Sequence, residues 1–151
     1  MKCVKKLVAV LLTAVMALTL LTACGGGGGW SGTSNADVGR RLTSKINSKL
    51  SDTGISLTYS DTLTNQIITF GQLLQAGVDE STAMVRAGIN GNDYEVVTVE
   101  INKDGSMEDA AGPLAIQIAA LKNSWGTAKQ IGYASAESIR NTRFIFALVR
   151  K

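Results

Sequence analysis

Apolar residues in the first half of the folded region recur at helical spacing in two stretches. Three to four residues between apolar positions place their side chains on one face of a helix. This spacing predicts one helix over about residues 36–51, capped by Ser34, and a second from Ser60-Asp61 to Gly77, with residues 55–59 extended between them. The two apolar stripes are Val38, Leu42, Ile46 and Leu50, and Leu63, Ile67, Phe70 and Leu74.

After Gly77 the apolar period changes from about 3.6 residues to about 2. Residues 82–89 and 94–101 flank Asn90-Gly91, and Asn-Gly between apolar runs predicts a β-hairpin. A third helix is expected with Pro113 in its first turn. Two more strands fit residues 129–136 and 142–150. The last run is apolar on both faces, which is typical of a strand inside a sheet.

The predicted elements follow one another in the order α-α-β-β-α-β-β. Runs of helices and strands of this kind predict an α+β fold. We expect an antiparallel sheet of about four strands packed against about three helices.

The first 23 residues have a different pattern. Residues 1–6 carry three lysines, residues 7–20 are uncharged and apolar, and Leu21-Thr22-Ala23-Cys24 is a short run that ends in cysteine. This arrangement resembles the signal peptide and lipobox of bacterial lipoproteins. The resemblance implies cleavage before Cys24, acylation of Cys24 with lipid such as palmitate, and a position on the outer side of the bacterial cell membrane. The alternative is an uncleaved transmembrane anchor over residues 7–23, which is short for a membrane span.

We therefore divide the chain into three parts. Residues 1–23 are the signal peptide, residues 24–33 are the lipidated cysteine with a Gly-rich tether, and residues 34–151 are a single α+β domain. A flexible tether of this composition reaches roughly 15 to 20 Å. The domain is therefore expected to stand just off the membrane.

Charge and cysteine content exclude several classes of function. The whole chain has a net charge of +3, but removing the three lysines of the signal leaves 12 basic and 12 acidic residues. This balance removes the argument for a nucleic-acid partner. The chain has no histidine, and Cys24 is the only thiol after cleavage. A disulfide within one mature chain, a Cys/His zinc site and imidazole catalysis are thereby excluded.

Two stretches of the domain carry a family resemblance: Leu57-Thr58-Tyr59-Ser60-Asp61-Thr62-Leu63, which follows the first helix, and the closing pair Ile131-Gly132-Tyr133-Ala134 and Thr142-Arg143-Phe144-Ile145-Phe146-Ala147. They resemble the CAP superfamily of SCP-like secreted domains. In that family an N-terminal helix leads through a short loop into a Leu-Thr-x-x-x-x-Leu segment and a second helix, and the chain closes with a hairpin. The histidines of that family's cleft and its Gly-Glu-Asn motif are missing here. No site residue of the family therefore carries over.

Acidic and amide side chains gather between residues 100 and 109. They loosely resemble a calcium loop, but the twelfth position, counted from Glu100, is Ala111 rather than glutamate. A turn at residues 102–105 followed by acidic residues at a helix start explains the cluster better. We therefore expect no metal and no cofactor. The residues concerned are Glu100, Asn102, Asp104, Glu108 and Asp109.

Aromatic residues with a polar tip and the basic residues near the C-terminus are the candidates for a binding surface. Core packing is the alternative role for the aromatic residues, and an ordinary solvated surface is the alternative for the basic ones. The candidates are Tyr94, Trp125, Tyr133, Arg140 and Arg143.

These observations predict a membrane-anchored surface lipoprotein whose domain binds an envelope protein or polymer and is not an enzyme. One alternative is an envelope glycan hydrolase that uses carboxylates alone, for which Glu100 and Glu137 are the candidates. Such an enzyme requires two carboxyl groups about 5 to 10 Å apart across a cleft. Another alternative is an accessory subunit of an envelope complex, which would use a strand edge or the basic C-terminal end as its contact surface.

Overall fold

A computed structural model of the chain describes residues 31–32, 36–123, 126–137 and 140–151. Its elements follow in the order β1 (Ser31–Gly32), α2 (Ala36–Lys49), β2 (Thr58–Tyr59), α3 (Asp61–Gln75), α4 (Glu80–Arg86), β3 (Tyr94–Asn102), α5 (Ala111–Leu121), β4 (Gln130–Glu137) and β5 (Thr142–Arg150). Short 3-10 turns at Ser51–Thr53 and Met107–Ala110 follow α2 and precede α5. The α+β class predicted from the sequence is confirmed.

The central sheet has the strand order β1-β4-β5-β3. Its three long strands are antiparallel neighbours, with β5 between β4 and β3. This place explains why β5 is apolar on both sides, as the sequence predicted. At the outer edge of β4, β1 pairs antiparallel and β2 pairs parallel, so the sheet is not purely antiparallel.

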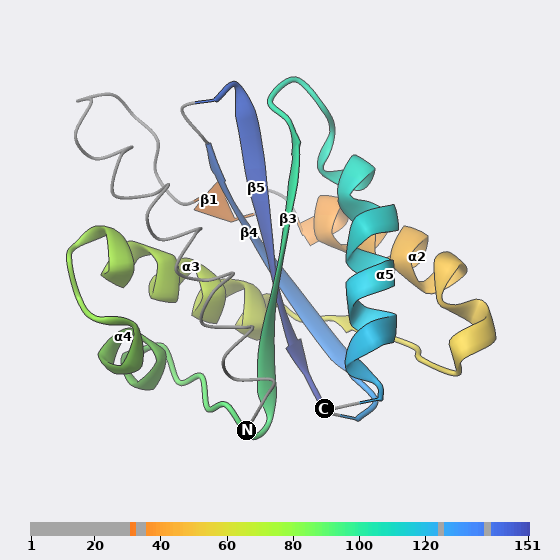
Figure 1. The fold of residues 1–151 in the computed structure, drawn as a ribbon, viewed down its shortest axis with the longest axis horizontal. Coiled ribbons are helices and arrows are strands. Elements are labelled where there is room, and N and C mark those ends of the chain that lie inside the picture. The colour runs from red at the N-terminus through yellow and green to blue at the C-terminus, as the bar shows by residue number, and fades with distance from the viewer. Residues whose placement is uncertain (1–30, 33–35, 124–125, 138–139) are drawn as a thin grey trace.

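Helices cover both faces of the sheet, so the molecule has three layers (Figure 1). On one face α2 and α5 pack over a cluster that includes Leu42, Ile46 and Ile118. On the other face α3 and α4 pack against the sheet, and the cluster between them includes Phe70 of α3 and Phe146 and Leu148 of β5. The two clusters lie on opposite sides because successive strand residues point to opposite faces. Burial on both faces gives a domain of this size two apolar layers to hold it together.

Residues 82–89 do not form the predicted strand, and the Asn90-Gly91 hairpin is wrong. Residues 80–86 form α4, and the capping carboxylate of Asp79 accepts a hydrogen bond from the Thr82 N–H at 3.0 Å. The helix ends before Gly88, whose φ of +73° is left-handed. Asn90 then turns the chain from α4 into β3, because its side-chain oxygen accepts from the N–H groups of Asn92 and Asp93. The capping interactions at both ends of α4 favour a helix here, and the weak alternation of apolar residues that predicted a strand did not decide the structure.

The other predicted elements are present with shifts of a few residues at their ends. The cap predicted at Ser60 is confirmed, because its hydroxyl accepts from the Leu63 N–H at 3.3 Å. Ser31–Gly32, which the sequence places in the tether, pair with Ser135 and Ala134 of β4. The signal peptide, Cys24 and the Ser34 cap lie outside the described residues. Among the described residues, no helix has both the length and the apolar character needed to cross a membrane.

Candidate functional site

A groove of about 500 Å³ lies at the end of β3 where the chain turns towards α5. The side chains come from β3, from the 3-10 turn at Met107–Ala110, from the first turn of α5 and from the start of β5. They are Glu100, Ile101, Asn102, Asp109, Pro113 and Thr142. The groove therefore joins the edge of the sheet to the N-terminal end of a helix.

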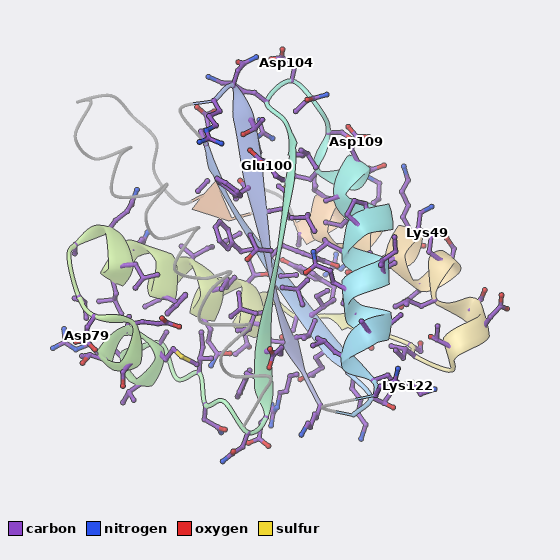
Figure 2. The ribbon with its side chains drawn as sticks, viewed as in Figure 1. Lys49, Asp79, Glu100, Asp104, Asp109 and Lys122 are labelled. Carbon is purple, nitrogen blue, oxygen red and sulfur yellow. The ribbon has the colours of Figure 1, made fainter. Side chains whose placement is uncertain are left out.

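Local chemistry fixes the two carboxylates of this groove. The Glu100 carboxylate on β3 accepts a hydrogen bond from the Thr142 hydroxyl of β5. The Asp109 carboxylate accepts from the Ser106 N–H at 2.9 Å and so holds the turn that leads into α5. Figure 2 shows Glu100 and Asp109 near the same end of the molecule, with Asp104 at the outer tip of the loop. The groove is thus acidic and is formed from ordered elements.

The acidic and amide residues between positions 100 and 109 do not all lie in one place in the structure. Glu108 points to α2, where it contacts Arg41 at 3.0 Å and Lys45 at 2.5 Å. Hydrogen bonds from Lys45 and Arg41 lower the pKa of Glu108. In the part of the chain that the structure describes, no group of three or more His, Cys, Asp or Glu residues is placed to hold a metal ion.

The outer edge of β3 next to this groove presents backbone groups that no strand among the described residues pairs with. Two hydrogen bonds, from Lys103 N to Asn141 O at 3.2 Å and from Lys151 N to Asp93 O at 3.1 Å, continue the β3–β5 ladder at its two ends. In an antiparallel pair, hydrogen-bonded residues alternate with non-bonded ones. Odd-numbered residues of β3 therefore bond to β5, and even-numbered residues point their N–H and C=O groups outwards.

Of the described residues, only a few form hydrogen bonds to this outer row. Gln117 of α5 donates its side-chain amide to the Thr98 carbonyl at 3.0 Å. The bonds at the two ends of the strand, Tyr94 N to Asn90 O and Gly105 N to Asn102 O, close the turns. No described residue pairs with the N–H and C=O groups of Val96 and Glu100, or with the N–H of Thr98.

The opposite edge of the sheet is closed. β2 occupies the outward groups of Lys129 and Ile131 on β4, through Thr58 N to Lys129 O at 2.9 Å and Ser60 N to Ile131 O at 2.8 Å. Further along, the Tyr133 N–H donates to the Thr64 hydroxyl at 3.1 Å. β1 covers the next positions. Within the described part of the chain the sheet therefore has one closed edge and one open edge, and the groove lies on the open one.

The two carboxylates proposed for a hydrolase lie on opposite faces of the sheet. Glu100 pairs across β5 with Phe144, and Glu137 pairs with the next residue, Arg143. Cross-strand partners share a face, and adjacent residues do not. Glu137 instead contacts Lys103 at 3.3 Å. The sequence could not reveal this, because it depends on the register of three strands.

The residues predicted to form a binding surface are not brought together. Tyr94 is half-buried at one end of β3, with the Arg150 guanidinium 5.5 Å from the centre of its ring. Arg143 is at the other end of the β3–β5 pair, where it donates to the Lys103 carbonyl at 3.1 Å. Arg140 is exposed in the turn before β5, and Trp125 lies outside the described residues.

Tyr133 is not on a surface, because its side chain is fully buried. Its hydroxyl shares a hydrogen bond of 2.8 Å with the hydroxyl of Thr43, and its ring stacks on Tyr59 at 6.2 Å between centroids. Burial raises the pKa of Tyr133 well above its usual range. The assignment of Tyr133 to a binding surface is therefore wrong. Tyr133 joins β4 to α2 and β2 inside the core.

Nothing in the sequence pattern pointed to Gln117, Thr142 or the open edge of β3. Glu100, Asn102 and Asp109 were identified as a cluster, and Pro113 as a helix start. No sequence signal marks β3 as an edge strand, because strand order depends on long-range pairing. No protein-family model matches the chain, and neither a curated protein nor a solved structure matches it.

Proposed function

We propose that this chain is a lipid-anchored protein of the bacterial envelope whose domain binds a partner and does not catalyse a reaction. The observation that carries the binding role is the acidic groove beside the open edge of β3. A groove that combines fixed polar groups with unpaired backbone groups is suited to recognition. The separation of Glu100 and Glu137 onto opposite faces argues against the two-carboxylate hydrolase.

The anchoring part of the proposal rests on the lipobox ending at Cys24. With Cys24 as the only thiol after cleavage, acylation explains why the chain carries a cysteine there. Kinship with the CAP superfamily is a further proposal. The passage from α2 through β2 into α3, and the β4–β5 hairpin, support it.

Replacing the anchor residue tests the first part. We expect Cys24→Ser to leave the domain folded but to move the protein out of the membrane fraction, or to hold it as uncleaved precursor. Mass spectrometry of the wild-type N-terminus is the direct measurement. An unmodified Met1 in the mature wild-type protein would contradict the anchor.

A photo-crosslinking residue in the groove tests the binding part. Pro113 is exposed and lines the groove, and Val85 on α4 is 76 % exposed and lies outside it. In intact cells we expect a crosslinker at position 113, and not one at 85, to give a discrete adduct with another envelope molecule. Equal adducts from both positions, or none from 113, would remove the groove as the binding site.

A further inference from the structure

The open edge of β3 is regular enough to accept another strand. All nine residues of β3 pair with β5 in an unbroken register, and the only proline of the chain is elsewhere. The outward groups of Val96, Thr98 and Glu100 therefore recur at every second residue, which is the repeat of an added strand. Natural proteins usually shorten, charge or cover such an edge. Among the described residues, Gln117 makes the one side-chain hydrogen bond to these outward backbone groups along the middle of the strand.

The edge is also self-complementary. A twofold axis at Thr98 would pair β3 with the β3 of a second copy in antiparallel register, so that Val96 lies opposite Glu100 of the other copy. No two like charges then face each other directly.

Opposite charges would meet at both ends of the paired β3 strands. Glu100 and Asp109 form no ion pair with any described residue. Arg150 leans over the ring of Tyr94 and so lies towards the same open edge, at its other end. Antiparallel pairing brings the Arg150 end of one copy to the Glu100 end of the other, twice. Within one chain these two residues lie six positions apart along the β3–β5 pair, roughly 20 Å.

A stripe of α5 adds apolar surface beside the proposed axis. Pro113, Ile116 and Ala120 are exposed and lie on the helix face that carries Gln117. Gln117 fixes this face next to Thr98. Ile116 is 73 % exposed, and with Val85 it is one of the two large apolar side chains exposed in the described residues. A second copy would cover this stripe with its own α5.

We propose that a second copy of this chain adds to β3 along the twofold axis at Thr98 and contributes Arg150 to the acidic groove. The two sheets then form one continuous sheet, and the groove becomes a composite site with carboxylates from one copy and a guanidinium from the other. This inference rests on the proposed binding role of the groove, but its test uses purified protein with no other envelope component. It can therefore fail while the groove still binds a partner in cells.

The first experiment measures the mass of the full-length protein, purified in detergent, by sedimentation equilibrium. We expect a dimer for wild type and for Val85→Ala, and a monomer for Thr98→Pro, because proline removes the outward N–H and blocks the approach of a strand. A monomeric wild type would overturn the proposal. A dimer that Thr98→Pro leaves intact would overturn it as well.

A charge exchange keeps the proposal testable if Thr98→Pro does not fold. We expect Glu100→Arg and Arg150→Glu each to raise the dimer dissociation constant about tenfold, since each dimer contains the contact twice. The double variant should recover wild-type affinity, because the pair re-forms across the axis with its signs reversed. Failure of the double variant to recover, with both single variants folded, would show that the two residues do not meet.

The approach of the second copy is tested with a cysteine on the exposed stripe of α5 beside the axis. We expect Ile116→Cys, whose native side chain is 73 % exposed, to be joined to a second copy by a short thiol-reactive crosslinker, and Val85→Cys to remain single. Crosslinking at both positions to the same extent would indicate nonspecific association and overturn the proposal.

Discussion

Gly132 lies where β4 passes closest to α3. A Cβ atom there would lie 2.2 Å from the backbone nitrogen of Thr64 and 2.5 Å from the carbonyl carbon of Leu63. Both are backbone atoms at the start of a helix, so neither can move aside alone. The absence of a side chain at residue 132 therefore sets how closely the α3 layer approaches the sheet. Because β4 and α3 lie this close together, the Thr64 hydroxyl can accept a hydrogen bond from the Tyr133 N–H.

We expect Gly132→Ala to destabilise the domain by about 3 kcal/mol, because helix and strand must separate to make room. Gly91→Ala is the matched control. A Cβ atom at Gly91 would meet nothing within 4 Å, and Gly91 is not among the glycines with positive φ. Its effect should stay within about 0.5 kcal/mol. Chemical denaturation measures both, and equal effects would mean that the contact between β4 and α3 is misplaced.

Glu95 gives the domain a pH-dependent stability near neutrality. Burial raises the pKa of this carboxyl group to about 7, and the charge of Lys151 opposes the shift. In the unfolded chain the group titrates near its ordinary pKa of 4.5. Between these values the folded state binds more protons than the unfolded state, so folding stability falls as pH rises from about 5 to about 7.

We expect Glu95→Gln to flatten this dependence. The variant and wild type should have similar stability near pH 4, where Glu95 is protonated in both states. Above pH 7 the variant should be more stable, by about 1 kcal/mol after allowance for solvent screening of a half-buried group. Unfolding free energies measured from pH 4 to pH 8 give the comparison. A constant difference across that range would show that Glu95 does not titrate there.

At the scale of elements, β3 has two chemically different sides. The odd residues use their N–H groups inside the ladder to β5, and the even residues do not. Proline lacks an N–H group, so a proline substitution destabilises the sheet where the replaced N–H bonds to β5 and has less effect where the N–H points outwards.

We expect Val97→Pro to unfold the domain or lower its melting temperature strongly, because it removes a ladder hydrogen bond. Thr98→Pro, one residue further, should keep most of the stability of wild type. Circular dichroism during thermal unfolding measures the difference. The reverse order of the two variants would mean that the register of β3 on β5 is shifted by one residue.

Elements with strong local signals were predictable from the sequence, and α4 shows the limit. The Ser60 cap and the three- to four-residue spacing of Leu63, Ile67, Phe70 and Leu74 identified α3. In α4 the buried position is Ala83, and Ala87 directly after the helix is buried in the same cluster with residues of α3. Alanine is apolar in both helical and alternating patterns, so periodicity alone did not distinguish a short helix from a strand.

At the scale of the whole molecule, the class of fold followed from the pattern, but the candidate site did not. Glu100 and Asp109 share a groove because β3 is at the edge of the sheet and α5 starts beside it. Tyr133 and Tyr94 look alike in the sequence, yet one lies inside the sheet core and the other near its rim. Such differences depend on strand order and register, which arise from contacts between distant residues.

The position of β1 has a consequence for the proposed lipid anchor, because it sets the side of the sheet at which the chain from Cys24 enters the fold. β1 pairs with β4, at the side of the sheet opposite β3, so three strand spacings of roughly 5 Å each separate the two edges. Under the proposed anchoring at Cys24, attachment would take place at the β1 side of the sheet and recognition at the β3 side. The two proposed roles would then use different surfaces, and a neighbour could approach β3 without displacing the tether.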